Sequence, residues 1–431
     1  MTSSLPDPIA AAQRFFGSAE FSSILTTVIF GTLFSSHALI RMLGNPGFSA
    51  MVATLVVAAL LSAISQHREV SWSERIPLTV VVFVLWCALS VAWTSKTGAT
   101  LSALNFQIGV ALLGLYIGAF RDVIQMVRAL GNALRVLLGV SLGLEILSGL
   151  LIDMPIVFLG IEGHLAQGGP IQGIFGSRND LAFVAVIALI TFGIEWRTRS
   201  VPPGLAWGSI VLATALLLFS GSAIQIGVAF CVAVTLLAMM AIRRRPLAER
   251  RNWQIVFFTG AALAAFLAWM FRSPIVTQLR ATKELETRLT LWQSVMDTAR
   301  QHPLEGWGWV GAWPNGVQPY FAINFDDGTR HQSALGAFFD LYLQVGLVGL
   351  ALFVVLLVVA LVRSLLVATS RQSVVYLWPS LVLVALSITS LAESTILTGA
   401  GWLLLVIAAS AASQNMSWRN RLRPTLADLS P

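Results

Sequence analysis

The residues of this chain that could do chemistry are concentrated in one polar stretch, residues 272–346, inside an otherwise apolar sequence. His331 in this stretch could serve as a general base. The guanidinium groups of Arg288 and Arg330 have the planar, forked geometry that grips a phosphate with two hydrogen bonds. A base together with phosphate-binding cations would suit a site that holds a phosphorylated substrate and moves a proton. The histidines and cations of the stretch are Arg272, Arg280, Lys283, Arg288, Arg300, His302, Arg330 and His331.

Two polar groups elsewhere in the chain could join this site. Arg178 lies in a polar run where Ser177 or Asn179 could cap a helix, and the free N–H groups of such a helix end attract anions. Glu393 follows a long apolar run, so it could be the buried partner of one of the arginines.

Residue type alone favours plainer interpretations, which stay open at this point. Arg178 could extend its side chain to a bilayer interface, and Arg288 could pair with Glu284 on a helix surface. His331 could be a loop histidine without a role. His302 precedes a proline and two glycines, a pattern that predicts the end of a helix.

Motifs for metal or nucleotide chemistry are missing from the sequence. It has no glycine-rich phosphate loop ending in Lys-Ser/Thr, no paired-cysteine zinc spacing and no His-Glu-x-x-His. No Asp-x-Asp pair stands where it could hold a divalent ion with a sugar nucleotide. We therefore expect no cofactor and no metal. An enzyme of this kind would need an activated donor carried by the membrane, such as a lipid pyrophosphate sugar, whose departing charge arginines can stabilise.

The elements that must position these residues are predicted to be membrane-spanning helices. Hydrophobic residues make up 56% of the chain and charged residues 11%, whereas soluble domains carry about 25% charged residues. A span needs about 20 mostly apolar residues, and about twelve segments qualify. We take Ser220–Ser222 as the turn between two of them. The predicted spans are 22–40, 47–65, 77–94, 100–120, 130–152, 178–195, 207–221, 222–242, 254–271, 347–369, 377–394 and 396–413.

The distribution of arginine predicts how these spans are oriented. With the N-terminus inside, most arginines between spans fall in cytoplasmic loops, and the short outer loops hold only Arg41, Lys96 and Arg178. The chain is thus predicted to be a multi-pass protein of a bacterial inner (plasma) membrane, surrounded by membrane lipids, with both termini in the cytoplasm. The high pI of 10.2 then reflects orientation signals, and no nucleic-acid partner is expected. The predicted cytoplasmic segments are 66–76, 121–129, 196–206, 243–253, 363–376 and 414–431.

The predicted fold class is an all-α integral membrane protein with about twelve transmembrane helices and one large extracytoplasmic helical segment. Residues 1–271 would hold about nine spans, 272–346 the extracytoplasmic segment, 347–413 the last three spans and 414–431 a cytoplasmic tail. The outer face would also carry the loop 153–177, the turn Ser220–Ser222 and the turn Glu393–Thr398, so that four polar features meet there.

Within the extracytoplasmic segment, an amphipathic helix is predicted from about Leu279 to Gln301. Its apolar face would consist of Leu285, Leu289, Trp292 and Met296, and it would lie on the membrane or pack over the spans. Residues 324–330 read as a turn, and a helix from about Ser333 would continue into the next span.

Several stretches resemble the O-antigen ligase and polymerase superfamily of bacterial envelope proteins, in the same order over about residues 100–410. The most specific is His302-Pro-Leu-x-Gly-x-Gly308 between an arginine-bearing helix and a histidine-bearing entry into a span. The other matching stretches are Gly173-Ile-Phe-Gly-Ser-Arg-Asn-Asp-Leu-Ala182, Phe219-Ser-Gly-Ser-Ala223, Arg288-x-x-x-Trp292, His331 followed by Leu343-Gln-Val-Gly-Leu-Val-Gly-Leu350, and Glu393-Ser394.

The resemblance implies a metal-independent glycosyltransferase. Such proteins move a glycan from a polyprenyl (undecaprenyl-type) pyrophosphate carrier to an acceptor hydroxyl of a glycan, lipid or wall component, at the outer face of the inner membrane. By this resemblance Arg178 and Arg288 would bind the pyrophosphate, with Arg330 assisting and Asn179, Glu393 and Arg41 in support. His331 would be the catalytic base, and in-line attack would invert the anomeric carbon.

Two departures from the family pattern affect these assignments. The turn Ser220-Gly-Ser222 lacks an arginine that relatives often carry there. Relatives also place His-Asn about one helical turn later, where this chain has Leu335-Gly336; a shift from i to i+4 would keep His331 on the same helix face.

Three functions remain open on the sequence. A ligase would attach a finished glycan to an acceptor, and a repeat-unit polymerase would use the same donor. A polysaccharide or lipid transporter is the non-enzyme alternative. The absence of internal repeats and the single large asymmetric outer segment disfavour the transporter.

Overall fold

The computed structural model describes residues 8–66, 76–270, 282–327 and 330–415, and this part of the chain is helical, with no strand and one isolated bridge between Ile156 and Ile161. The long helices are α1 Pro8–Phe16, α2 Ala19–Phe34, α3 Ser36–Ser65, α5 Leu78–Leu89, α6 Thr97–Phe120, α7 Val123–Ile146, α8 Arg178–Thr198, α9 Pro203–Phe219, α10 Ala223–Arg243, α11 Leu247–Met270, α13 Thr282–Ala299, α14 Tyr320–Asp327, α15 Ala337–Ser370, α16 Leu377–Thr389 and α17 Gly399–Asn415. The short helices are η2 Ser90–Ala92, η3 Leu147–Ile152, η4 His164–Gln167, η5 Gly173–Phe175, η6 Val374–Tyr376 and η7 Thr395–Leu397.

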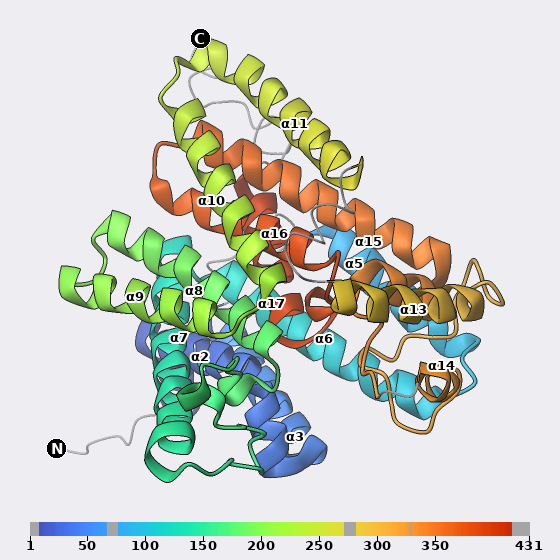
Figure 1. The fold of residues 1–431 in the computed structure, drawn as a ribbon. Coiled ribbons are helices and arrows are strands. Elements are labelled where there is room, and N and C mark those ends of the chain that lie inside the picture. Colours follow the sequence, from blue (N-terminus) through green and yellow to red (C-terminus); the bar gives the residue numbers. More distant parts are fainter. Residues whose placement is uncertain (1–7, 67–75, 271–281, 328–329, 416–431) are drawn as a thin grey trace.

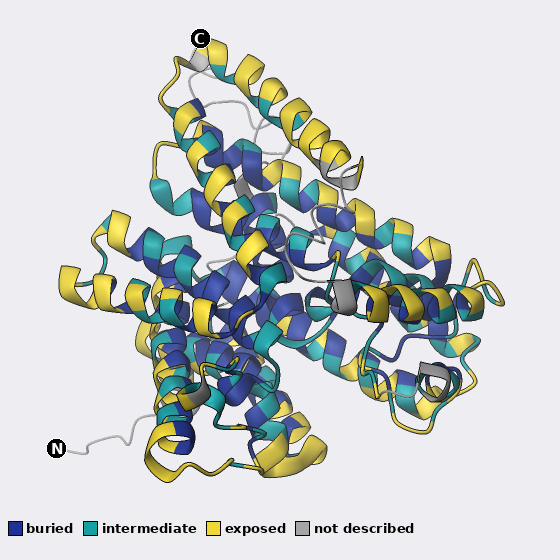
Figure 2. Cartoon of the chain, in the orientation of Figure 1, coloured by how far each residue is buried: buried dark blue, intermediate teal, exposed yellow. Residues whose placement is uncertain are grey.

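Helices α8, α16 and α17 form the centre of the molecule, and the other long helices surround them (Figure 1). Nearly every residue of α17 from Trp402 to Ala412 is buried, whereas α9, α10 and α11 expose large apolar side chains such as Phe230 and Phe266 (Figure 2). A soluble protein would bury such side chains, so this distribution fits outer helices that face lipid.

The apolar helices support the prediction of a membrane protein. Six described helices are long and apolar enough to cross a bilayer. Most of the segments predicted as spans lie mainly within one helix, but the span predicted at 22–40 runs across the break between α2, which ends at Phe34, and α3, which begins at Ser36. The predicted hairpin is confirmed, because α9 ends at Phe219 and α10 begins at Ala223. The six candidate spans are Ser36–Ser65, Thr97–Phe120, Val123–Ile152, Arg178–Thr198, Ala223–Arg243 and Ala337–Ser370.

The segment that holds α13 and α14 builds a small apolar core of its own against the beginning of α15. In α13 the fully buried residues are Leu291, Val295 and Ala299, and these pack with Trp313 and Tyr320. The predicted apolar face of this helix is therefore wrong: Leu289 is 45% exposed, because the face that carries Leu291, Val295 and Ala299 is the one packed against Trp313 and Tyr320. Residues 279–281, where the helix was predicted to begin, lie outside the described residues.

Two further details of this segment differ from the sequence prediction. Residues up to Asp327 of the predicted 324–330 turn belong to α14, and 328–329 lie outside the described residues. Helix α15 begins at Ala337 rather than near Ser333, because Leu335 adopts a left-handed conformation (φ 49°) that a helix cannot continue through.

The stretch 302–308 docks into a kink of α15. The backbone of α15 breaks at Gly346 (φ 67°), and the freed groups find partners in this stretch: Leu347 N–H donates to Pro303 O (2.9 Å) and Trp307 N–H donates to Leu343 O (3.0 Å). His302 ends the preceding helix, as predicted, since its N–H still bonds to Ala299 O. Two motifs separated by about 40 residues in the sequence are thus one packing unit.

Replacing Gly346 with alanine is expected to destabilise the protein strongly. The left-handed backbone costs a non-glycine residue about 1–2 kcal/mol, and a Cβ there would also overlap the carbonyl of Leu304. Gly316 is a matched control, because it has a similar φ of 69° with open space around it. Thermal unfolding in detergent should show a larger loss for Gly346→Ala than for Gly316→Ala; equal losses would mean that the docking of 302–308 contributes nothing.

Candidate active site

The site begins at the N-terminus of α8. Ser177 caps this helix, because its hydroxyl accepts the N–H of Asp180 (3.0 Å) and donates to the Asp180 carboxylate (2.7 Å). Of the two capping candidates from the sequence, Ser177 takes this role. Asn179 instead points its amide to other helices: it accepts from the hydroxyl of Ser222 (2.7 Å) and donates to Glu393 (2.8 Å). The start of α8 is therefore tied to the turn before α10 and to the end of α16.

Glu393 lies at the centre of these contacts. Its Oε1 atom accepts from Asn179 and also from Nη2 of Arg288 at 2.9 Å, and its side chain is only 14% exposed. The buried arginine partner expected for Glu393 is thus Arg288, on a helix 105 residues away in the sequence. A carboxylate placed between an amide and a guanidinium occupies the kind of anion site that a phosphate oxygen could also fill.

Arg288 is almost fully enclosed, with 7% of its surface exposed. Besides Glu393 it donates to the carbonyl oxygen of Leu335 (3.0 Å) and to that of Ala392. A guanidinium has five N–H donors, and these bonds use three of them. Arg288 therefore joins α13 to the segment before α15 and to the loop after α16. The alternative ion pair with Glu284 falls on a side chain that lies outside the described residues.

Asp340 fixes the segment between His331 and α15. This carboxylate, 1% exposed, accepts from the indole of Trp313 (2.6 Å), the N–H of Ala334 (3.0 Å), the amide of Gln344 (3.3 Å) and the hydroxyl of Ser394 (2.5 Å). Sequence reasoning missed Asp340, although a single acid in the long apolar run of α15 is a signal of a functional or structural site.

His331 lies in the extended segment before α15, half-buried. Asn324 of α14 holds its backbone on both sides: Oδ1 accepts the His331 N–H (3.0 Å) and Nδ2 donates to the His331 carbonyl (3.1 Å). The expected i to i+4 relation with Leu335 is wrong, because neither residue is helical. The Asn324 side chain thus fixes the backbone of His331, and the sequence gives no signal for this pair of hydrogen bonds.

The Leu335 carbonyl and its neighbours connect His331 to the arginine. Trp313 N–H donates to Gln332 O (2.8 Å), the Trp292 indole donates to Ala334 O (2.8 Å), and Arg288 donates to Leu335 O. Ala334 and Leu335 of the segment that bears His331 are therefore bonded to α13, the helix that carries Arg288, and Gln332 is bonded to Trp313 outside that helix.

The other predicted site residues lie at different distances from this network. Arg178 is the first residue of α8, next to Asn179, and is half-buried. Arg330 is exposed on the chain beside His331. Arg41 of α3 lies near His37 and Gly160, at the loop 153–177. It is therefore at the edge of the site, here called the rim, and not among the contacts around Glu393.

The four polar features that the sequence predicts to share a face do meet. The loop 153–177 bonds to the turn before α10 through Ile171 N–H and Phe219 O (3.1 Å), that turn bonds to Asn179, and Asn179 bonds to Glu393, which pairs with Arg288. The turn Ser220–Ser222 has no arginine. The polar residue that follows this turn, Gln225, is fully buried and donates to Thr389 of α16 (3.4 Å).

The electrostatics of the region combine one buried ion pair with several neutral donors. Burial, and then the nearby Asp340 carboxylate, raises the pKa of Tyr320 well above its usual value, so its phenol remains a neutral donor toward Gly308 O. Within the described residues no group of three or more histidine, cysteine or acidic side chains is placed to hold a metal ion. The arrangement can bind an anion at Arg288, next to the chain segment that carries His331.

Comparison with known families gives one match. Residues 208–354 match the family model described as O-antigen ligase. They include the turn before α10, Arg288, the docked stretch 302–308, His331 and the kink of α15, and they cover less than half of the 431-residue chain. The predicted resemblance to the O-antigen ligase/polymerase superfamily is confirmed over this region. No curated protein matches the chain closely enough to be called a relative.

Proposed function

We propose that this chain, whose residues 208–354 match the O-antigen ligase domain, is a glycosyltransferase that moves a glycan from a polyprenyl pyrophosphate carrier to an acceptor hydroxyl, without a metal. The family match supports an O-antigen ligase- or polymerase-like enzyme. The observation that carries the finer proposal is the enclosed anion position at Arg288, where a carboxylate already sits, beside a segment that bears a histidine.

In this proposal Arg178 and Arg288 bind the pyrophosphate, Arg330 and Arg41 add positive charge at the rim, and Asn179 and Glu393 position Arg288. The phosphate oxygens of the donor replace the Glu393 carboxylate on Nη2 of Arg288. This exchange keeps the guanidinium charge of Arg288 compensated, while the amide of Asn179 remains as a donor to the Glu393 carboxylate.

The transfer step has one bond formed and one broken. His331 takes the proton of the acceptor hydroxyl, and the oxygen attacks the anomeric carbon of the donor. The bond between that carbon and the pyrophosphate oxygen breaks, the electron pair leaves with the lipid pyrophosphate, and the arginines stabilise the charge that develops there. Attack in line with the leaving group inverts the anomeric carbon.

The proposed location is a bacterial inner membrane, with twelve spans, both termini in the cytoplasm and the site on the outer face. The positions of the arginines support this orientation. Helices α8 and α10 have the site at their N-termini and arginines at their other ends, where Arg243 donates to the Gln372 carbonyl and Arg128 donates to the Ser200 carbonyl (2.6 Å). The site and the arginine-rich loops thus lie at opposite ends of these helices, as the positive-inside rule requires.

The decisive experiment is a transfer assay with purified protein in detergent, a polyprenyl pyrophosphate glycan extracted from the native host, and EDTA throughout. We expect glycan to leave the lipid in EDTA and to appear on an acceptor. Products longer than one donor glycan would identify a polymerase, and a single addition would identify a ligase. An intact lipid pyrophosphate, with glycan-lipid crossing a liposome membrane, would establish a transporter and overturn the proposal.

A further inference from the structure

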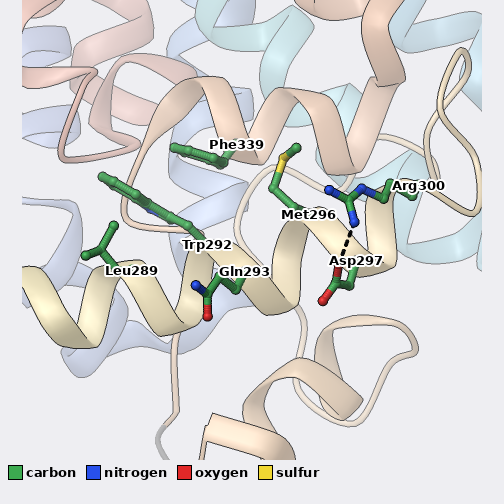
Figure 3. Close-up of a pocket in the computed structure, with 7 residues that line it drawn as sticks. All are labelled: Leu289, Trp292, Gln293, Met296, Asp297, Arg300 and Phe339. Atoms are coloured by element: carbon green, nitrogen blue, oxygen red, sulfur yellow. Dashed lines mark hydrogen bonds and ion pairs between the residues drawn. The ribbon is translucent and has the colours of Figure 1, made fainter.

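The strongest unassigned feature is an open groove along α13, with a volume of about 350 Å³ (Figure 3). One wall is a single stripe of α13 at helical spacing, and the other is Phe339 of α15. At 1.5 Å per residue the stripe is about 16 Å long, which is longer than a single amino-acid side chain. The lining residues are Leu289, Trp292, Gln293, Met296, Asp297, Arg300 and Phe339.

The groove contains a rigid aromatic surface. The rings of Trp292 and Phe339 are stacked, with centroids 4.5 Å apart and planes 14° from parallel. The indole N–H is fixed to Ala334 O, so the ring cannot turn, and Gly336 leaves the room that this position requires, since a Cβ there would lie 3.3 Å from the indole nitrogen. Aromatic rings held in this way present contact area at low entropic cost.

The polar residues of the groove oppose a membrane-facing role. Gln293 and Asp297 are exposed, and Asp297 accepts from Arg300 (3.0 Å) with both side chains about 70% exposed. Hydrocarbon disfavours such charges, and the apolar face of α13 is already buried against the protein. Ordered rings beside an amide, a carboxylate and a guanidinium match a ligand with both apolar C–H faces and many hydroxyl groups, which is the chemistry of a sugar ring.

The position of the groove identifies which sugar. Trp292 lies one helical turn from Arg288, and the two side chains bond to adjacent carbonyls, those of Ala334 and Leu335. The first sugars of a glycan whose pyrophosphate is held at Arg288 would therefore reach Trp292. We propose that this groove binds the pyrophosphate-proximal sugars of the donor glycan. The inference rests on the proposed function for the identity of the donor, and its chemistry concerns the glycan alone.

The test is direct binding, which needs no turnover. The probe is the oligosaccharide released by mild acid from the polyprenyl pyrophosphate of the native host, titrated calorimetrically into full-length protein in nanodiscs. Wild type is compared with the double variant Gln293→Ala/Asp297→Ala, whose exposed side chains are not needed for folding, and with Trp292→Phe. The matched control is Thr290→Ala, an exposed residue of the same helix that does not line the groove.

We expect the double variant to weaken binding at least about tenfold, with Thr290→Ala unchanged. Equal binding by wild type and the double variant would overturn the inference. Displacement of the probe by sugar-free polyprenyl phosphate would assign the groove to lipid, and tighter binding of acceptor glycan than of donor glycan would assign it to the acceptor; either also overturns it. Because the experiment measures binding and not transfer, a protein that binds the glycan but does not transfer it would overturn the proposed function and would still support the assignment of this groove.

Discussion

Arg288→Ala is expected to lower glycan transfer at least about 100-fold. The loss of one preorganised donor from a site that stabilises developing negative charge typically costs two to three orders of magnitude in rate, and Arg288 is enclosed beside the proposed position of the pyrophosphate. The initial rate of glycan release from the lipid carrier, measured in EDTA, checks the prediction. Arg197→Ala, at the exposed far end of α8, should retain full activity.

Loss of stability must be separated from loss of chemistry in this variant. Removal of Arg288 leaves the Glu393 carboxylate enclosed without its cation, a situation that costs about 3–5 kcal/mol in buried pairs. The double variant Arg288→Met/Glu393→Gln removes both charges, so it should recover most of the lost thermal stability and none of the transfer. A stable double variant that transfers glycan at a rate near that of wild type would show that Arg288 holds the fold and not the donor.

His331→Ala is expected to lower the transfer rate about 100- to 10,000-fold while the affinity for the donor stays close to wild type. A positioned base contributes rate enhancement of this size. The fold should tolerate the change, because Asn324 holds the backbone of His331 and not its ring. Single-turnover rates and donor dissociation constants, measured on the same preparations, check both halves of the prediction.

Two neighbours provide controls for the histidine. Gln332→Ala alters an exposed side chain whose residue bonds only through its carbonyl to Trp313, so transfer should be unchanged. Asn324→Ala removes both bonds that place His331 and should reduce the rate by a smaller factor than His331→Ala, with donor affinity retained. Transfer near the wild-type rate in His331→Ala would assign the proton to another group.

The apolar helical character of the chain and the turn at Ser220–Ser222 could be predicted because the length of an apolar run and the residue types at a turn are local properties. The same holds for the turn at His302, which follows the end of α13 at Ala299. The prediction was less accurate for α13, because the elements packed against an amphipathic helix determine which of its faces is buried. Helix α13 has two apolar stripes: Leu291, Val295 and Ala299 are buried against the protein, whereas Leu289 and Trp292 line a groove.

The candidate site divides in the same way. Arg178, Arg288, Glu393 and His331 are candidates from the sequence, because charged groups in a largely apolar chain are costly and therefore few, and their roles stay predictions. Asn324 could not be predicted, because hydrogen bonds from a side chain to a distant backbone leave no sequence pattern. The helical spacing between His331 and Leu335 was wrong, because Leu335 has a left-handed conformation and α15 begins only after it.

The sequence by itself determined that this chain forms apolar helices, that its charged groups are few, and that residues 208–354, with Arg288 and His331 among them, match the O-antigen ligase family model. Only the tertiary structure decided that Glu393 pairs with Arg288, that Asp340 gathers four donors, and that residues 302–308 fill the kink at Gly346. Helix formation follows from neighbours along the chain, whereas the partner of a buried charge is set by whichever distant group the packed helices bring within hydrogen-bond distance.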